Sequence, residues 1–145
     1  MKWIFALLPL LLLAAAAPRP IGIVINGNVL SLDPGPRFEH KLLYVPVRRT
    51  IEALGLAFDR SGNRIVTQIG SKTVVLTIGS PIAQVDTGQL ALEGPLLEIK
   101  DVLYVPLRFF TDILGAQAHF DRHTNTVTIV AQLVGRSSRG LVPVG

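Results

Sequence analysis

Arg48 and Arg108 are the residues whose placement most needs a chemical explanation, because each follows a Val-Pro-x sequence that predicts the start of a helix. The helix dipole disfavours a cation in the first turn, so a nearby anion must compensate. Asp59 and Asp121 recur at matching places, and a carboxylate can accept two parallel hydrogen bonds from an arginine. We therefore expect two structural clamps, Arg48 with Asp59 and Arg108 with Asp121. Two anion-binding sites are the alternative interpretation.

Residues 33–41 and 93–101 occupy matching places but differ in sequence, and both are predicted to be loops. Recognition residues usually lie in variable loops on a rigid scaffold. The first loop carries Arg37, Phe38 and His40, which could together stack on and hydrogen-bond a sugar or a peptide. These three residues are the candidate ligand-binding set. The alternative is that Phe38 fills the core beneath its loop.

His119 and His123 flank Asp121, a spacing that invites interpretation as a metal site. Residues 116–121 are predicted to form a strand in which Phe120 faces inward, so His119 faces outward. His123 lies past the end of that strand, and no helix brings the two imidazoles together. We expect no metal site here, only a pair of solvated histidines.

The chain lacks the residue patterns of a catalytic site. It has no cysteine, no serine in a nucleophile elbow and no phosphate-cradling glycine motif. Its carboxylates recur as matching pairs, Asp33 with Glu93 and Asp59 with Asp121, whereas acid–base catalysis needs two carboxyl groups in unlike surroundings. We predict that the protein is not an enzyme and uses no cofactor.

The sequence segments that must position these side chains form an internal repeat. Residues 44–48 (Tyr-Val-Pro-Val-Arg) return sixty residues later as residues 104–108 (Tyr-Val-Pro-Leu-Arg). Downstream the alignment slips by two, so that 58–60 (Phe-Asp-Arg) match 120–122. A repeat made of apolar residues, proline, glycine and arginine repeats a packing solution, because one such small unit cannot bury its own apolar face.

Each copy is predicted to contain antiparallel strands and one short helix. Helices of about nine residues are expected at 46–54 and 106–114, beginning at a proline and ending before a glycine; such helices are stable only when packed on a sheet. Tyr44 and Tyr104 are expected to be core or edge residues. The predicted strands are 21–25, 29–32, 42–45, 56–59, 64–69, 73–78, 82–85, 89–92, 116–121 and 126–130, with an Asn26-Gly27 hairpin turn. The expected fold class is α+β, with two pseudo-symmetric repeats, about 20–79 and about 80–133, forming one compact unit.

The N-terminus has the pattern of a secretory signal: a lysine, an apolar run and a stretch of alanines over residues 1–17. The run is too short for a permanent membrane anchor, the weaker alternative, so no stable span is expected after cleavage. Without cysteine, a lipoprotein anchor and disulfides are excluded. Residues 18–133 are expected to form the exported domain, and 134–145 a flexible tail.

The basic pI of about 10.0 does not indicate a nucleic-acid partner. Between residues 20 and 133, seven Arg and three Lys balance six Asp and four Glu. The excess charge lies in the flanks, and no basic strand with interleaved aromatics is present. A neutral domain of this kind lacks the electrostatic footprint of a nucleic-acid binder.

The sequence resembles the copper amine oxidase N-terminal-like domain, also called the stalk domain. The resemblance is carried in the second copy by Val-Pro-Leu-Arg at 105–108, Leu-Gly-Ala at 114–116, Phe-Asp at 120–121 and Asn-Thr-Val-Thr-Ile at 125–129. It implies an exported bacterial module in which antiparallel strands curl around short helices, usually appended and non-catalytic. Phe58 and Phe120 stand where the family commonly has Trp, and the first copy is two residues shorter after Gly55. The copper chemistry belongs to a separate, large domain.

We therefore expect a non-catalytic, exported protein, secreted and periplasmic or associated with the cell wall, that binds or supports a cell-wall glycan, peptidoglycan or an envelope protein partner. The alternative is a modulator of an exported enzyme, either an inhibitor or an assembly factor. A glycan binder should expose aromatic residues around its loops, whereas a protein modulator should expose one contiguous apolar patch. The oligomeric state is left open.

Overall fold

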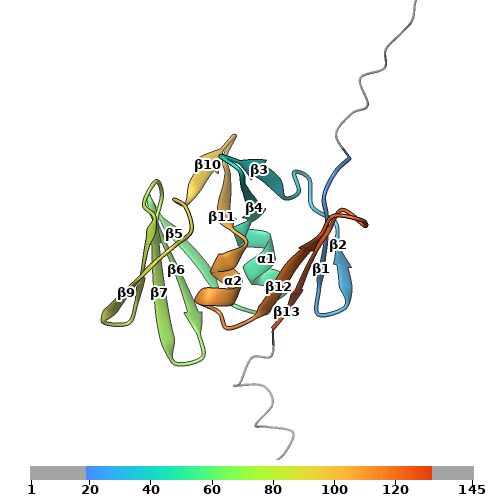
Figure 1. Ribbon diagram of the computed structural model, residues 1–145. Helices are drawn as coiled ribbons and strands as arrows, with labels where there is room; N and C mark the ends of the chain where they lie inside the picture. The colour runs from blue at the N-terminus through green and yellow to red at the C-terminus, as the bar shows by residue number, and fades with distance from the viewer. Residues whose placement is uncertain (1–18, 132–145) are drawn as a thin grey trace, which may run out of the picture.

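Three β-sheets surround two short helices in the computed structural model, which describes residues 19–131 (Figure 1). Sheet A has the strand order β12-β13-β1-β2, formed by Gln117–Asp121, Thr126–Val130, Gly22–Ile25 and Asn28–Leu30. Sheet B has the order β10-β11-β4-β3, formed by Leu97–Ile99, Val102–Pro106, Leu42–Pro46 and Arg37–Glu39. Sheet C has the order β5-β6-β7-β8-β9, formed by Phe58–Ser61, Arg64–Ile69, Lys72–Thr77, Ile82–Val85 and Gly88–Ala91. The described chain is mostly β, with a smaller helical share than the predicted α+β class suggests.

Both helices are shorter than predicted. Helix α1 is Val47–Ala53 and helix α2 is Arg108–Asp112. The prolines expected to begin them instead end the preceding strands, and Pro46 has an extended backbone with φ −57° and ψ 118°. Each proline is held in sheet B, where it lies opposite a tyrosine of the neighbouring strand. The strand therefore passes into the helix with no intervening loop.

Two predicted loops contain hairpin strands. Strand β3 lies within 33–41 and strand β10 within 93–101, each followed by a two-residue turn. The turn residues have positive φ, at 49° and 67° for His40 and Lys41 and again for Lys100 and Asp101. Turns of this type usually carry Asn-Gly or Asp-Gly, so these pairs gave no hairpin signal. By contrast, the predicted Asn26-Gly27 turn is confirmed between β1 and β2.

The strands of the two predicted repeats pair with each other. Strand β1 pairs in parallel with β13, and β8 pairs with β7 in sheet C. In sheet B, β4 and β11 pair antiparallel with Val45 opposite Val105. The prediction that all strands pair antiparallel is therefore wrong for β1 and β13. Parallel neighbours require a long connection between them, and here that connection is most of the described chain. Neither predicted half is therefore complete without the other.

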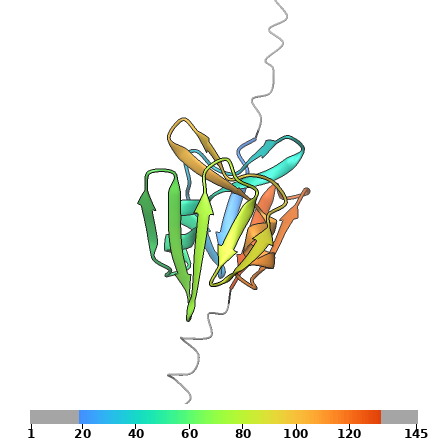
Figure 2. The ribbon, with the colours of Figure 1, turned by 90° about the vertical axis from the view of Figure 1, so that its left-hand side faces the viewer.

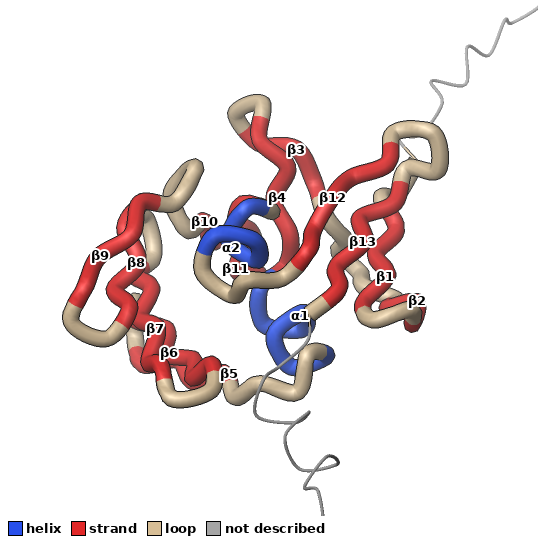
Figure 3. The backbone as a smooth tube through the Cα atoms, turned by 60° about the horizontal axis from the view of Figure 1, so that its bottom comes forward, coloured by secondary structure: helices blue, strands red, loops and turns tan. Residues whose placement is uncertain are grey.

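The core lies where the helices meet the inner faces of the sheets. Figure 2 shows sheet C facing the viewer, and Figure 3 shows both helices between sheet C and the strands of sheet A. Ile51 of α1 and Phe110 of α2 are fully buried with Ile23, Val45 and Leu76 of the three sheets. Helices of seven and five residues are too short to persist alone, so this packing holds them.

Tyr44 and Tyr104 are confirmed as core residues, with 0% and 1% of their surfaces exposed. The Tyr44 hydroxyl donates a hydrogen bond of 3.0 Å to the carbonyl oxygen of Pro95. Burial raises the pKa of this phenol, and the carboxylates of Glu93 and Glu39 raise it further. The segment before β10 is thereby fastened over the side chain of Tyr44.

The predicted signal at 1–17 and tail at 134–145 lie outside the described residues. Within residues 19–131, neither helix has the length and apolar character needed to cross a membrane.

Replacing Gly94 by alanine should destabilise the fold by about 1–3 kcal/mol, the usual cost of overpacking a filled site. A Cβ there would lie 2.6 Å from the Tyr44 hydroxyl oxygen and 2.8 Å from Leu42 Cδ1. Chemical denaturation measures the effect. Gly88→Ala is the control, because its nearest contact would be the Val85 carbonyl oxygen at 3.6 Å; equal losses in both variants would contradict the packing argument.

Candidate functional site

Phe38 lies on strand β3 rather than in a loop, and it is 55% exposed. Its ring packs edge-on against Phe120 of β12, with ring centroids 5.7 Å apart and an interplanar angle of 77°. The alternative prediction that Phe38 fills the core is therefore wrong. An exposed aromatic ring supported by a second ring offers a surface on which a flat apolar face can stack.

Arg37, the second candidate ligand-binding residue, does not share this surface. Arg37 projects from the opposite side of β3, because successive side chains of a strand alternate. Its guanidinium pairs with Glu39 and lies 6.0 Å from the centre of the Tyr104 ring. Burial raises the pKa of the Tyr104 phenol, and Arg37 opposes that rise. His40 lies in the turn that ends β3. Strand alternation thus separates Arg37 from Phe38.

Arg48 and Arg108 pair within their own helices. The Arg48 Nε donates to Glu52 Oε1 at 3.1 Å, and the Arg108 Nε lies 3.9 Å from Asp112 Oδ2. Both pairs join residues four apart and are well exposed, with 65% and 66% of the two arginine side chains accessible. Exposed pairs of this kind contribute little to stability.

Neither predicted clamp is found among residues 19–131. The Arg48 guanidinium lies 5.6 Å from the centre of the Phe58 ring, so Asp59, the next residue of β5, projects from the other face of the strand. Asp121 accepts a hydrogen bond of 2.8 Å from the backbone N–H of His123 and thereby closes the turn after β12. The helix cations are compensated locally rather than across the fold.

His119 is exposed on β12, and Phe120 packs against the core, as the strand pattern predicted. His123 lies beyond the end of the strand, in the turn before β13. Within the described part of the chain, no group of three His, Asp or Glu side chains is placed to hold a metal ion.

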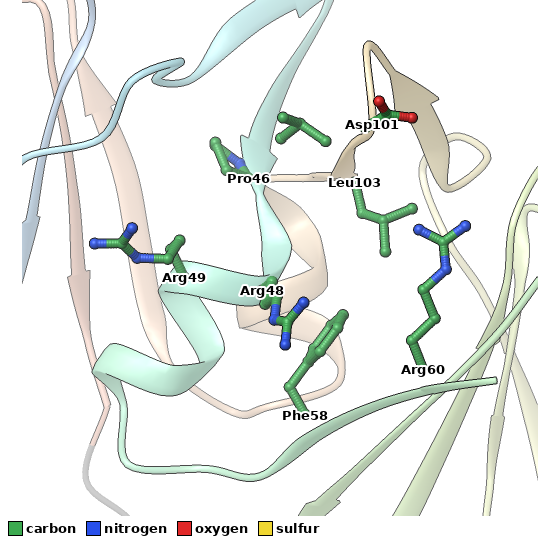
Figure 4. A pocket seen from close by; sticks show the side chains of 8 residues that line it. Pro46, Arg48, Arg49, Phe58, Arg60, Asp101 and Leu103 are labelled. Atoms are coloured by element: carbon green, nitrogen blue, oxygen red, sulfur yellow. The ribbon is translucent and has the colours of Figure 1, made fainter. Parts of the chain in front are cut away.

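A pocket of about 170 Å³ lies between α1, β5 and the start of β11 (Figure 4). Figure 4 shows the guanidinium of Arg48 beside the ring of Phe58, while that of Arg49 is turned the other way. The apolar lining consists of Pro46, Phe58, Val102 and Leu103. The charged lining consists of Arg48, Arg49, Arg60 and Asp101.

An ion pair closes one side of this pocket. The Arg60 Nη1 donates to Glu98 Oε2 at 2.6 Å, and the Arg60 Nε donates to the carbonyl oxygen of Gly62 at 2.9 Å. The hydrogen bond to Glu98 raises the pKa of Arg60 and lowers the pKa of the Glu98 carboxyl. This contact fastens the β10 hairpin to the edge of sheet C.

Sequence reasoning missed the pocket. Arg60 and Glu98 are 38 residues apart and lie on strands of different sheets, so no local spacing joins them. The repetition of residues 58–60 at 120–122 was the one available signal. This repetition indicated that residues 58–60 are important, but it did not indicate which residues surround them in the fold.

The sequence model of the copper amine oxidase N-terminal domain matches residues 24–129, most of the chain. The protein belongs to this family. The matched range begins in β1 and ends in β13, so this accessory domain of the copper amine oxidase type spans all three sheets. It is a non-catalytic domain, and no catalytic domain is recognised in the chain. No curated protein and no solved structure matches the chain. The resemblance inferred from the repeated motifs is thereby confirmed.

We expect Glu98 to titrate below its usual range, and to move back towards that range in Arg60→Gln, because the arginine stabilises the ionised carboxylate. The lowered pKa means that the pair stabilises the fold above the carboxyl's unfolded pKa, and that this contribution is lost as pH falls through the folded pKa. Carbon-detected NMR of the Glu98 carboxyl measures the shift. Arg64→Gln, on the neighbouring strand β6, should leave the titration unchanged; an equal effect would exclude a specific pair.

Removing either helix cation should change stability very little. Arg48→Leu and Arg108→Leu are each expected to alter the free energy of unfolding by no more than about 1 kcal/mol, because each arginine pairs with an exposed carboxylate one turn away and Arg48 adds only an exposed contact with the Phe58 ring. Thermal and denaturant unfolding measure the change. A loss of more than about 2 kcal/mol in either variant would show that the arginine is a structural clamp after all.

Proposed function

We propose that this protein is an exported, non-catalytic envelope module that binds cell-wall glycan or peptidoglycan. The observation that carries the proposal is the exposed ring of Phe38 supported by Phe120, at the outer edge of sheet B. Aromatic side chains exposed at a strand edge suit the apolar faces of sugar rings. Family membership supports the non-catalytic part of the proposal.

A cell-envelope location is part of the same proposal. The first seventeen residues have the composition of a secretory signal, and the domain that follows carries balanced charge. The sequence contains no cysteine, so the proposal includes neither a disulfide nor a cysteine-linked lipoprotein anchor. A small rigid domain of this kind suits attachment to a polymer in the envelope.

The paired motifs favour a pseudo-symmetric scaffold for this module. In sheet B, matching residues of the two copies lie opposite each other around Val45 and Val105. Such an arrangement presents two related surfaces, one near Phe120 and one near Phe58. Differences between these surfaces then decide what each can bind.

The alternative of an enzyme modulator receives less support. Large exposed apolar side chains are divided among all three sheets, with Val29 and Val130 in sheet A, Phe38 in sheet B, and Ile82 and Leu90 in sheet C. A docking surface for a protein partner is expected to be one contiguous apolar patch.

Purified protein should co-sediment saturably with isolated peptidoglycan sacculi at moderate salt. Phe38→Ala should weaken pelleting by about tenfold, because stacking on an aromatic ring contributes on the order of 1 kcal/mol or more. Ile82→Ala, which removes an exposed apolar side chain on sheet C, is the matched control. Arg136→Gln with Arg139→Gln tests whether the basic tail alone causes pelleting. Pelleting that follows the tail charges and ignores Phe38 would contradict the proposal.

A further inference from the structure

We propose that the pocket between α1, β5 and β11 binds a zwitterionic amino-acid group, with its carboxylate on Arg48 and its ammonium at Asp101. In Figure 4, Arg48 and Phe58 lie on one side of the pocket and Asp101 lies across it. A cation and a carboxylate at separate places in one small pocket match a ligand with both charges.

The charge balance of the pocket favours a neutral ligand over a polyanion. The lining contributes three arginines and one aspartate. Two of these arginines are already paired, Arg48 with Glu52 and Arg60 with Glu98. The three cations are therefore matched by three carboxylates in and around the site. A phosphate-rich polymer would meet those carboxylates, whereas a zwitterion can approach both signs of charge.

Arg48 is the cation best able to change partner. Its pair with Glu52 is exposed, with 65% of the arginine side chain accessible, and such pairs are weak and screened by salt. Arg60 is held more firmly, by Glu98 at 2.6 Å and by the Gly62 carbonyl. Arg48 can therefore turn to a ligand carboxylate while Arg60 keeps the wall of the pocket in place.

The size and apolar lining of the pocket limit the ligand to one residue. A volume of about 170 Å³ is smaller than the roughly 300–1,000 Å³ of pockets for drug-sized ligands. Phe58, Leu103 and Pro46 supply apolar surface for a short aliphatic side chain. The site thus suits a free amino acid, or a wall-peptide residue whose side chain ends in both a free ammonium and a free carboxylate.

At the matching place beside Phe120, the first copy supplies an aromatic ring, Phe38. Phe38 and Glu98 are the central residues of the corresponding strands β3 and β10. Phe38 packs on Phe120, whereas Glu98 turns to Arg60 beside Phe58. One substitution between the copies therefore distinguishes an aromatic surface from an open, charged pocket.

This inference rests on the proposed function for its wall-peptide form, but the pocket can be tested without the wall. Leucine added to the isotope-labelled protein should shift the backbone amide signals of Phe58, Asp101 and Leu103 in a saturable way. N-acetylleucine lacks the ammonium and leucinamide lacks the carboxylate, so each should bind about tenfold more weakly or worse. No saturable shift, or equal binding of N-acetylleucine, would overturn the proposal.

Two variants make the test specific. Arg48→Gln should weaken leucine binding by about tenfold or more, while Arg108→Gln, an equally exposed arginine in the matching helix, should leave it unchanged. Glu98→Phe should abolish binding by placing a ring against Phe58, as Phe38 lies against Phe120. Equal binding in Arg48→Gln and Arg108→Gln would overturn the assignment of Arg48.

Competition separates this inference from the proposed function. If leucine binds saturably and also releases the protein from sacculi, the pocket takes a wall-peptide side chain that ends in both a free ammonium and a free carboxylate. If leucine binds but sacculi do not pellet the protein, the pocket takes a free amino acid and the wall-binding proposal fails. If sacculi pellet Arg48→Gln normally and leucine binds neither protein, the pocket inference fails and wall binding stands.

Discussion

The antiparallel pairing of β4 with β11 is the constraint on which the rest of the structure depends. It places Val45 opposite Val105 and sets each proline opposite a tyrosine of the other strand. Because proline has no N–H to donate, it marks the last position where the chain can follow the sheet. Each strand then turns into its helix, and because the two strands are antiparallel, the helices begin at opposite ends of this short ladder. The inner faces of sheets A and C bury those helices, which could not persist alone at their observed lengths.

The pairing of β4 with β11 also places two surfaces of similar sequence at different edges of the fold. Each copy places a phenylalanine, Phe58 or Phe120, beside the hairpin that precedes the other copy's central strand. The residue at the middle of that hairpin strand then decides the local chemistry. Phe38 adds a second ring to one surface, whereas Glu98 engages Arg60 and leaves a charged pocket beside the other. A few side chains at the sheet edges therefore make these two surfaces chemically distinct.

This division fits the family assignment, because the matched domain is a non-catalytic accessory module. Two arginines beside the pocket, Arg48 and Arg60, are in ion pairs with partly exposed carboxylates on the protein surface. The buried tyrosines and phenylalanines of the core hold in place the strand edges that carry these exposed groups.

The sequence by itself determined most local elements, because hairpin turns such as Asn26-Gly27, alternating strands and the presence of two short helices depend on neighbouring residues. It also determined the family, the burial of Tyr44 and Tyr104 and the outward direction of His119. The hairpins β3–β4 and β10–β11 were missed because the residues of their turns have positive φ angles although none of them is glycine. Only the tertiary structure decided the partners of Arg48, the parallel pairing of β1 with β13 and the meeting of Arg60 with Glu98. Those contacts depend on which strands become neighbours and in which register they pair. The pairing follows from the packing of the whole core rather than from any local spacing in the sequence.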